Sequence, residues 1–287
     1  MKLAFLTPLS VEAVQNAKKL GYDAIEVNAR WFDQPALLEI ERELSRYKDV
    51  LKEHKIAVTS VAVYGPTIES PLEEAVEHYA RAFRVARALG CGVVSGLTGR
   101  DNERTVEENI PLFQKYFGEI ARIAEDQGVR IALEPWPGRV VGHGPYRWTN
   151  LATTPELWDR LFEAVPSPAL GLEYDPSHLV WQGIDHLQAI RDYGERIYHL
   201  HAKDIVIDER RLRRVGVHGQ GWWRFVLPGL GQINWPELFK ALREAGYKGD
   251  MAVEHEDREF RDERWNEGLL LALKALRPLV EEFNRNR

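Results

Sequence analysis

Short apolar segments alternate with longer amphipathic segments along this chain, and this alternation is the feature that most restricts its fold. Eight segments rich in β-branched and apolar residues are typical of strands. They are KLAFLT (2–7), DAIEVNA (23–29), IAVTSVAVYG (56–65), CGVVSGLTG (91–99), VRIALEP (129–135), ALGLEYDP (169–176), RIYHLHAKD (196–204) and DMAVEHED (250–257). The segments between them are long enough for helices, for example 36–54, 72–89, 106–127, 155–165 and 235–245.

A glycine follows several of the helical segments, just before the next strand. Gly21, Gly90, Gly128 and Gly246 stand where a helix commonly ends in the left-handed conformation. Parallel strands need helical crossovers, and eight such units close most simply into a (β/α)8 TIM barrel of the α/β class. An open doubly wound sheet is the competing fold, although no glycine-rich phosphate motif follows the first strand. A length of 287 residues without a linker predicts a single barrel domain over 1–287.

Charge, hydropathy and cysteine content limit the partners and the compartment. With 38 Lys and Arg against 44 Asp and Glu, the net charge is −6, so we expect no nucleic-acid partner. No apolar run approaches the roughly eighteen residues of a membrane span, and we expect no membrane association. The one cysteine, Cys91, cannot form an internal disulfide, which favours a reducing, cytoplasmic location. The sequence leaves a homo-oligomer open.

Four side chains that suit a metal stand at the carboxyl ends of consecutive strands. Glu134 ends the fifth strand, Asp175 the sixth, His201 the seventh and Glu254 the eighth. In a barrel these ends meet at one mouth, where three carboxylates need a cation to offset their repulsion. We therefore predict that these residues bind a divalent ion, with Mn²⁺, Mg²⁺ or Co²⁺ favoured over a thiolate-rich structural Zn²⁺ site. The competing interpretation of each acid is a helix cap or a solvated loop residue.

Two further residues lie on the same strands, one layer deeper. His199 shares a face with His201 but is farther from the mouth, so we assign the metal to His201 and a satisfied, partly buried role to His199. Glu173 lies two residues before Asp175, and it is either a supporting acid behind the site or part of an ion pair in the barrel interior.

Residues near the presumed mouth are candidates for substrate binding. His178 and Lys203 follow the sixth and seventh strands, and the alternatives are a solvent-facing residue at a helix start and a surface ion pair. Asp204 could orient a histidine. The candidates from the loops are His218, Arg224, Trp223 and Trp136. Aromatic faces suit the C–H faces of a sugar ring, and plain loop packing is the alternative for the tryptophans. The irregular segment 205–234 is predicted to be an ordered loop over the barrel mouth.

Four segments resemble the xylose isomerase-like (β/α)8 barrels of the sugar phosphate isomerase/epimerase family. These are ALEP (132–135), GLEYDPSHLVWQGID (171–185), HLHAKD (199–204) and LPGLGQINWPELFKALREAGYKGDMAVEHED (227–257). Carried over residue by residue, the family's metal ligands fall on Glu134, Asp175, His201 and Glu254. His178 and Lys203 match positions where the family often has polar active-site residues. The endonuclease branch of the family has a histidine-rich, multi-zinc mouth, which this chain does not match.

The resemblance and the strand-end residues together predict a sugar isomerase or epimerase. A metal-stabilised enediolate would form when one glutamate, Glu134 or Glu254, removes a proton, and the other would return it. Alternatives are a metal-dependent lyase or dehydratase acting on a keto-polyol or keto-glycoside, and a non-catalytic sugar-binding barrel. We expect a small carbohydrate as substrate and Mn²⁺ as the metal, with Mg²⁺, Co²⁺ or Zn²⁺ as alternatives.

Overall fold

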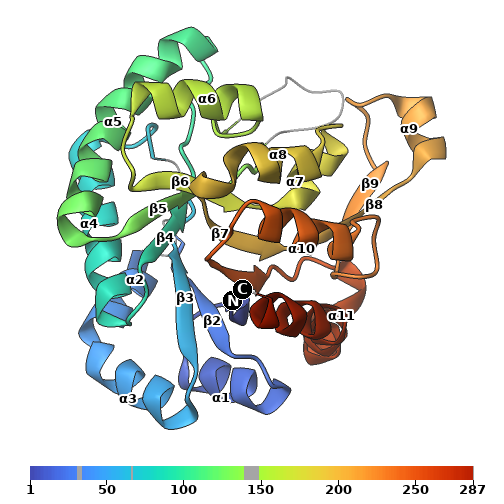
Figure 1. Cartoon of the computed structure of the whole chain (residues 1–287). Coiled ribbons are helices and arrows are strands. Elements are labelled where there is room, and N and C mark those ends of the chain that lie inside the picture. The colour runs from blue at the N-terminus through green and yellow to red at the C-terminus, as the bar shows by residue number, and fades with distance from the viewer. Residues whose placement is uncertain (31–33, 66, 139–148, 287) are drawn as a thin grey trace.

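The strands form a closed parallel barrel in the computed structural model, which describes residues 1–30, 34–65, 67–138 and 149–286 (Figure 1). Around the barrel the order follows the chain, and it closes where the first strand pairs with the last. The barrel strands are β1 (Leu3–Thr7), β2 (Ala24–Asn28), β3 (Ala57–Ala62), β4 (Val93–Gly96), β5 (Arg130–Leu133), β6 (Leu170–Tyr174), β7 (Ile197–Ala202) and β10 (Asp250–Val253). The eight predicted strands and the TIM barrel are thus confirmed, and the open sheet is excluded.

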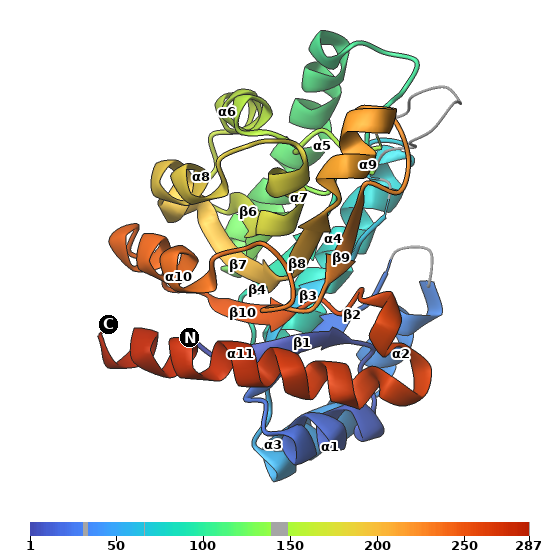
Figure 2. The same ribbon diagram turned by 90° about the vertical axis from the view of Figure 1, so that its right-hand side faces the viewer.

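Most of the helices cover the outside of the barrel (Figures 1 and 2). The helices of the described residues are α1 (Val11–Leu20), α2 (Gln34–Arg42), α3 (Leu44–His54), α4 (Leu72–Ala88), α5 (Val106–Gln127), α6 (Pro155–Ala164), α7 (Pro176–Trp181), α8 (His186–Tyr193), α9 (Glu209–Val215), α10 (Trp235–Glu244) and α11 (Trp265–Arg285). Three 3₁₀ turns are η1 (Gly194–Arg196), η2 (Arg258–Phe260) and η3 (Asp262–Arg264). The apolar side of each long helix packs on the strands, and this layer forms the core.

Local sequence signals set most of these boundaries. The four helix-ending glycines have φ values between 65° and 91°, as predicted. Helix α5 begins at a capping box in which Thr105 and Glu108 bond each other's backbone N–H groups. One boundary differs from the prediction: the amphipathic run 36–54 forms two helices, because Glu43 between them has a ψ of 12°, outside the helical range.

The segment between β7 and α10 also differs from the predicted loop. It contains two strands, β8 (Asp204–Ile207) and β9 (Trp223–Val226), which pair antiparallel and flank α9. In Figure 1 this segment projects from the barrel at the upper right. The prediction of an ordered segment is confirmed, but its strands were missed because each is only four residues long and the two pair across 15 intervening residues.

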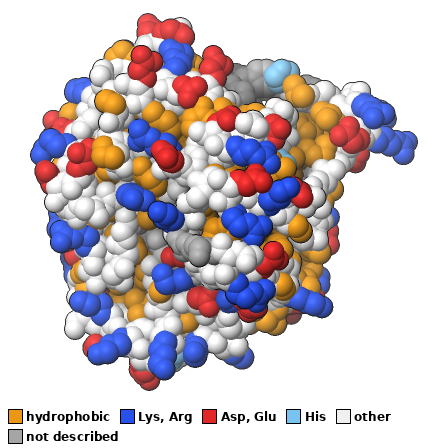
Figure 3. Space-filling view, viewed as in Figure 1, with side chains coloured by type: hydrophobic (Ala, Val, Ile, Leu, Met, Phe, Trp, Pro, Cys, Tyr) orange, Lys and Arg blue, Asp and Glu red, His pale blue; other side chains and the backbone are white. Residues whose placement is uncertain are grey.

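The two ends of the chain are in contact at the surface. The amino group of Met1 donates to Asn284 Oδ1 at 2.7 Å, and the two ends of the chain lie side by side (Figures 1 and 2). Among the described residues, no helix has the length and apolar character needed to cross a membrane. On the face shown in Figure 3, Lys and Arg side chains are interspersed with Asp and Glu. The absence of a nucleic-acid partner stays a prediction.

Acidic pH should destabilise the fold through His78, a buried residue of α4. Burial, with a smaller contribution from Arg81, lowers the pKa of His78 from 6.5 to about 4. Below about pH 6.5 this histidine takes up a proton in the unfolded chain, whereas in the folded protein it stays neutral down to about pH 4. The free energy of unfolding therefore falls as the pH drops from about 6.5 to about 4. The loss should reach about 2–3 kcal/mol.

This loss can be measured by urea denaturation of the wild type and His78→Gln at about pH 7 and about pH 4.5. The glutamine variant does not titrate, so its stability should fall less over this interval. An equal fall in both proteins would contradict the assignment.

Candidate functional site

Four polar side chains come directly after barrel strands and meet at one end of the barrel. Glu134 follows β5, Asp175 follows β6, Lys203 follows β7 and Glu254 follows β10. Three of them are buried, and the side chain of Glu254 is 13% exposed. The carboxyl ends of parallel strands converge in a barrel, which explains why residues up to 120 positions apart come together here.

A cluster of possible metal ligands surrounds the Lys203 ammonium. Glu134, Asp175, His178 and Glu254 each offer one ligand atom, and these atoms lie within 4.8 Å of one another; we call them the acidic centre. Lys203 Nζ lies 3.1 Å from Asp175 Oδ2 and 2.5 Å from Glu254 Oε2. Burial alone would lower the pKa of Lys203, but the carboxylates of Asp175 and Glu254 raise it well above its usual value. A cation is therefore favourable at this position.

His201 lies beside the acidic centre, on the side of the barrel interior. Its Nδ1 lies 3.2 Å from Glu254 Oε2 and 3.5 Å from Glu134 Oε1. Its Nε2 lies 2.9 Å from Glu26 Oε2, on the other side of the ring. The structure thus brings together all four residues predicted to bind the metal, and it adds His178 and Lys203 to the group.

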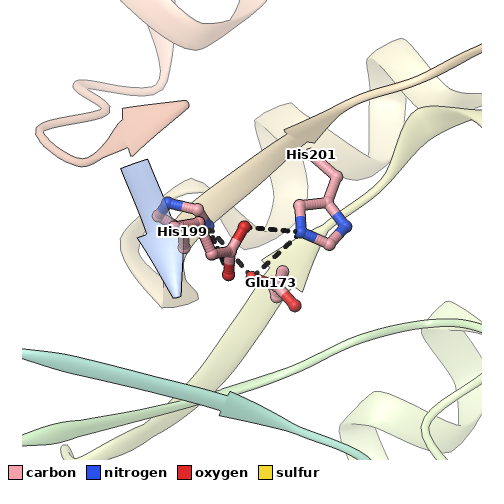
Figure 4. Close-up of side chains that lie close together, drawn as sticks. Glu173, His199 and His201 are labelled. Carbon is pink, nitrogen blue, oxygen red and sulfur yellow. Dashed lines mark hydrogen bonds and ion pairs between the residues drawn. The ribbon is translucent and has the colours of Figure 1, made fainter. Parts of the chain in front are cut away.

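A second polar cluster fills the barrel interior beneath the acidic centre. We call Glu26, Glu173, His199 and His201 the inner network; each is fully buried. Figure 4 shows Glu173, His199 and His201 close together, and His199 Nδ1 lies 3.0 Å from Glu173 Oε1. Tyr64 also donates to Glu173 Oε2, at 2.5 Å. Of the two roles predicted for Glu173, the structure supports both: it is paired with His199, and it lies behind the site.

Opposite pKa shifts distinguish the two acids of the inner network. Burial raises the pKa of Glu173 to about 7, with a further contribution from the charge of Glu26. Burial would also raise the pKa of Glu26, but His199 and His201 outweigh it and lower the value to about 2. Near neutral pH, Glu26 is therefore ionised beside His201, whereas Glu173 is only partly ionised.

The acidic centre suits a divalent cation better than the inner network does. In the inner network, Glu173 already accepts bonds from Tyr64, Ser95 and His199. At the boundary between the two clusters, the buried Nδ1 of His201 faces the carboxylates of Glu134 and Glu254 in the acidic centre. Three carboxylates and one imidazole nitrogen form a donor set suited to a divalent ion. The acidic centre also borders a cavity of about 490 Å³.

Asp175 combines the predicted ligand role with the competing interpretation as a cap. Its Oδ1 accepts bonds from the Ser177 backbone N–H at 2.8 Å and from the Ser177 hydroxyl at 2.7 Å, which caps α7. Its Oδ2 faces Lys203 and lies 3.5 Å from His178 Nε2. The cap therefore fixes this carboxylate so that one oxygen points into the acidic centre.

Of the predicted substrate-binding residues, some lie at the acidic centre, some line a cavity and one does neither. His178 is fully buried, so its solvent-facing alternative is wrong, and Lys203 lies inside the site rather than in a surface ion pair. Trp136 lines the 490 Å³ cavity. Trp223 and Arg224 on β9 line a neighbouring cavity. His218 is exposed and is not among the described residues that line either cavity.

Asp204 orients no histidine among the residues that the structure describes. Its two oxygens accept bonds from the backbone N–H groups of Ile205, Gly229 and Ile233, and from Trp235 Nε1. These bonds tie the start of β8 to the segment that leads into α10. Asp204 therefore holds the β8–β9 segment in place beside the site.

Sequence reasoning missed Glu26 and Tyr64. Glu26 is the one charged residue of β2, AIEVN, where the neighbouring side chains are apolar and buried. A lone carboxylate in a buried strand needs a partner, and this signal was available in the sequence. Tyr64 follows β3, and nothing local distinguishes it from a core tyrosine. Its role becomes visible only where its hydroxyl reaches Glu173, 109 residues away.

Two curated relatives resemble the chain over most of its length. The uncharacterized protein YfiH of Bacillus subtilis (strain 168) is 27% identical, covering 98% of this chain and 100% of the relative. The inosose dehydratase of Clostridium beijerinckii is 25% identical, covering 83% of this chain and 72% of the relative. The chain therefore has sugar-modifying enzymes among its sequence relatives.

Solved structures share the fold. A structure described as IOLI protein with a bound zinc atom has a TM-score of 0.74 and 21% identity, covering 99% of each chain. The D-allulose 3-epimerase of Methylomonas sp. in complex with D-allulose has a TM-score of 0.68 and 20% identity, covering 98% of this chain and 96% of the epimerase. A family model described as xylose isomerase-like TIM barrel matches residues 14–278. The chain belongs to the xylose isomerase-like TIM barrel family.

Proposed function

We propose that this protein is a metal-dependent isomerase or epimerase of a sugar or keto-sugar. The observation that supports it most directly is the pair Glu134 and Glu254, which both border His201 Nδ1 and both line the 490 Å³ cavity. In this proposal Glu134, Asp175, His201 and Glu254 hold the ion, with Mn²⁺ as the native metal. Held there, a divalent cation supplies electrostatic stabilisation for negative charge next to a carbonyl.

The two glutamates can move the proton. Removal of a C–H proton by one carboxylate sends its bonding electrons into the adjacent carbonyl, which gives an enediolate. A proton that the other glutamate has taken up from solvent then returns to the opposite face of the same carbon and inverts that centre. Burial would raise the pKa of Glu254, but Lys203 and His201 hold it well below its usual value, so Glu254 rests as the carboxylate.

A lyase or dehydratase is the second candidate, favoured by the inosose dehydratases among the relatives. The same enediolate can expel a β-hydroxyl, which leaves as water once it gains a proton. Lys203 Nζ and His178 Nε2 lie 3.3 Å apart at the acidic centre, where either could supply that proton. Isomer formation and loss of water differ only in the step after proton removal.

Incubation of the Mn²⁺-loaded protein with aldoses, ketoses and inososes in D₂O separates the candidates. We expect an isomeric sugar with deuterium at the reacting carbon, seen by NMR and mass spectrometry. A dehydrated product supports the second candidate and overturns the first. If no substrate incorporates deuterium or loses water, both fail.

A further inference from the structure

A second cavity lies directly beside the one that the acidic centre borders. It has a volume of about 550 Å³, and it shares Trp136 and Glu256 with the first cavity. Pockets that bind small molecules measure roughly 300–1,000 Å³, so the first cavity is by itself large enough for a single sugar. The second cavity therefore provides room beyond the reacting sugar.

Aromatic side chains form one side of the second cavity. Trp223 stacks on Trp181 with ring centroids 5.4 Å apart, and it packs against Phe225 at 4.8 Å. These contacts hold the Trp223 ring in a fixed orientation. Trp136, at the junction of the two cavities, is 40% exposed, which is unusual for so large an apolar side chain. Fixed and exposed aromatic rings suit the C–H faces of a sugar.

Charged side chains line the rest of this cavity. Arg224, Arg258 and Arg261 supply guanidinium groups, and Glu256 and Glu259 supply carboxylates. Arg224 lies 3.2 Å from Glu259, so these two charges form an ion pair at the cavity. Guanidinium and carboxylate groups can donate to and accept from ring hydroxyls. Aromatic faces combined with such groups form a site for a polar ring rather than for an alkyl chain.

Phe225 connects this cavity with the acidic centre. Its ring lies under the Lys203 ammonium, with Nζ 4.5 Å from the centroid, and it meets the edge of His178 at 5.3 Å. A ligand that contacts Phe225 in the second cavity is thus separated from the reacting groups by one aromatic ring. The two cavities can hold two linked units of one molecule.

We propose that the second cavity is a subsite for a second sugar ring, so that the substrate is a glycoside or disaccharide. The reacting sugar lies at the acidic centre, and the linked ring stacks on Trp136 and Trp223. This inference rests on the proposed function, because it assumes a sugar in the first cavity. It assigns a binding role to Arg258 and Arg261 that the sequence did not suggest.

Calorimetric titration of the Mn²⁺-loaded protein tests this subsite without requiring turnover. The probes are matched pairs: D-glucose with cellobiose, D-galactose with lactose, D-mannose with mannobiose, and D-fructose with lactulose. We expect at least one disaccharide to bind about tenfold more tightly than its monosaccharide. In Trp223→Ala and Arg258→Ala this preference should fall about fivefold to tenfold.

Trp222→Phe is the matched control. Trp222 is a buried neighbour in the same segment and does not line the second cavity, so its substitution should lower the melting temperature and keep the preference for the disaccharide. If monosaccharides bind and no disaccharide binds more tightly, the subsite is overturned and the proposed function stands. If no sugar of the panel binds, both are overturned.

Discussion

Glu134→Gln and Glu254→Gln should each lower kcat by about 10²–10⁴-fold, the usual contribution of a general acid or base. Glutamine keeps the size of the side chain and one acceptor oxygen, but it cannot take a proton from carbon. Both glutamates border His201 Nδ1, so neither can replace the other without a change of geometry. Metal content, measured on the same samples, separates loss of the base from loss of the ion.

Exchange of the substrate C–H proton with D₂O distinguishes the roles of the two glutamates more directly than kcat does. If each glutamate serves one face, a variant that lacks one of them should still exchange the C–H proton of one epimer and not that of the other. The control is Glu263→Gln, an exposed glutamate that lines neither cavity. Its kcat should fall far less. Equal losses in all three variants would contradict the two-base assignment.

Glu26→Gln should weaken metal binding by about 10–100-fold, although Glu26 does not belong to the acidic centre. A histidine that binds a metal through Nδ1 must carry its proton on Nε2, and that proton needs an acceptor. Glu26 Oε2 lies 2.9 Å from His201 Nε2, in a fully buried setting. The carboxylate thus fixes both the tautomer and the orientation of the ring. A neutral amide accepts this bond more weakly and removes the charge.

Competition with a chromophoric chelator measures this affinity for Mn²⁺ and Zn²⁺. Glu173→Gln is the matched control, because Glu173 belongs to the same network but bonds mainly to Tyr64, Ser95 and His199. Both variants should melt at a lower temperature in the metal-free form. Only Glu26→Gln should lose affinity by tenfold or more. Wild-type affinity in Glu26→Gln would contradict a positioning role.

The sequence determined the barrel because its signals are local and repeated. Each strand is a short apolar run in the sequence, and the glycines after the helices mark the ends of the strand–helix units. Both signals can be recognised without the rest of the chain. Barrel closure then places every strand end at one mouth. This is why the sequence pattern alone predicts that Glu134, Asp175 and Glu254 lie close together.

The tertiary structure alone decided how these side chains are paired. Lys203 lies within the acidic centre, and Glu26 bonds His201 across 175 positions of sequence, because barrel closure leaves only β1 and β10 between β2 and β7 and turns both strands toward one interior. The β8–β9 pairing, which positions β9 along the second cavity, likewise depends on contacts between distant segments. The hydrophobic periodicity of a strand specifies which face a side chain is on. The side chain that it contacts depends on strand register and barrel closure, and no local sequence pattern specifies these.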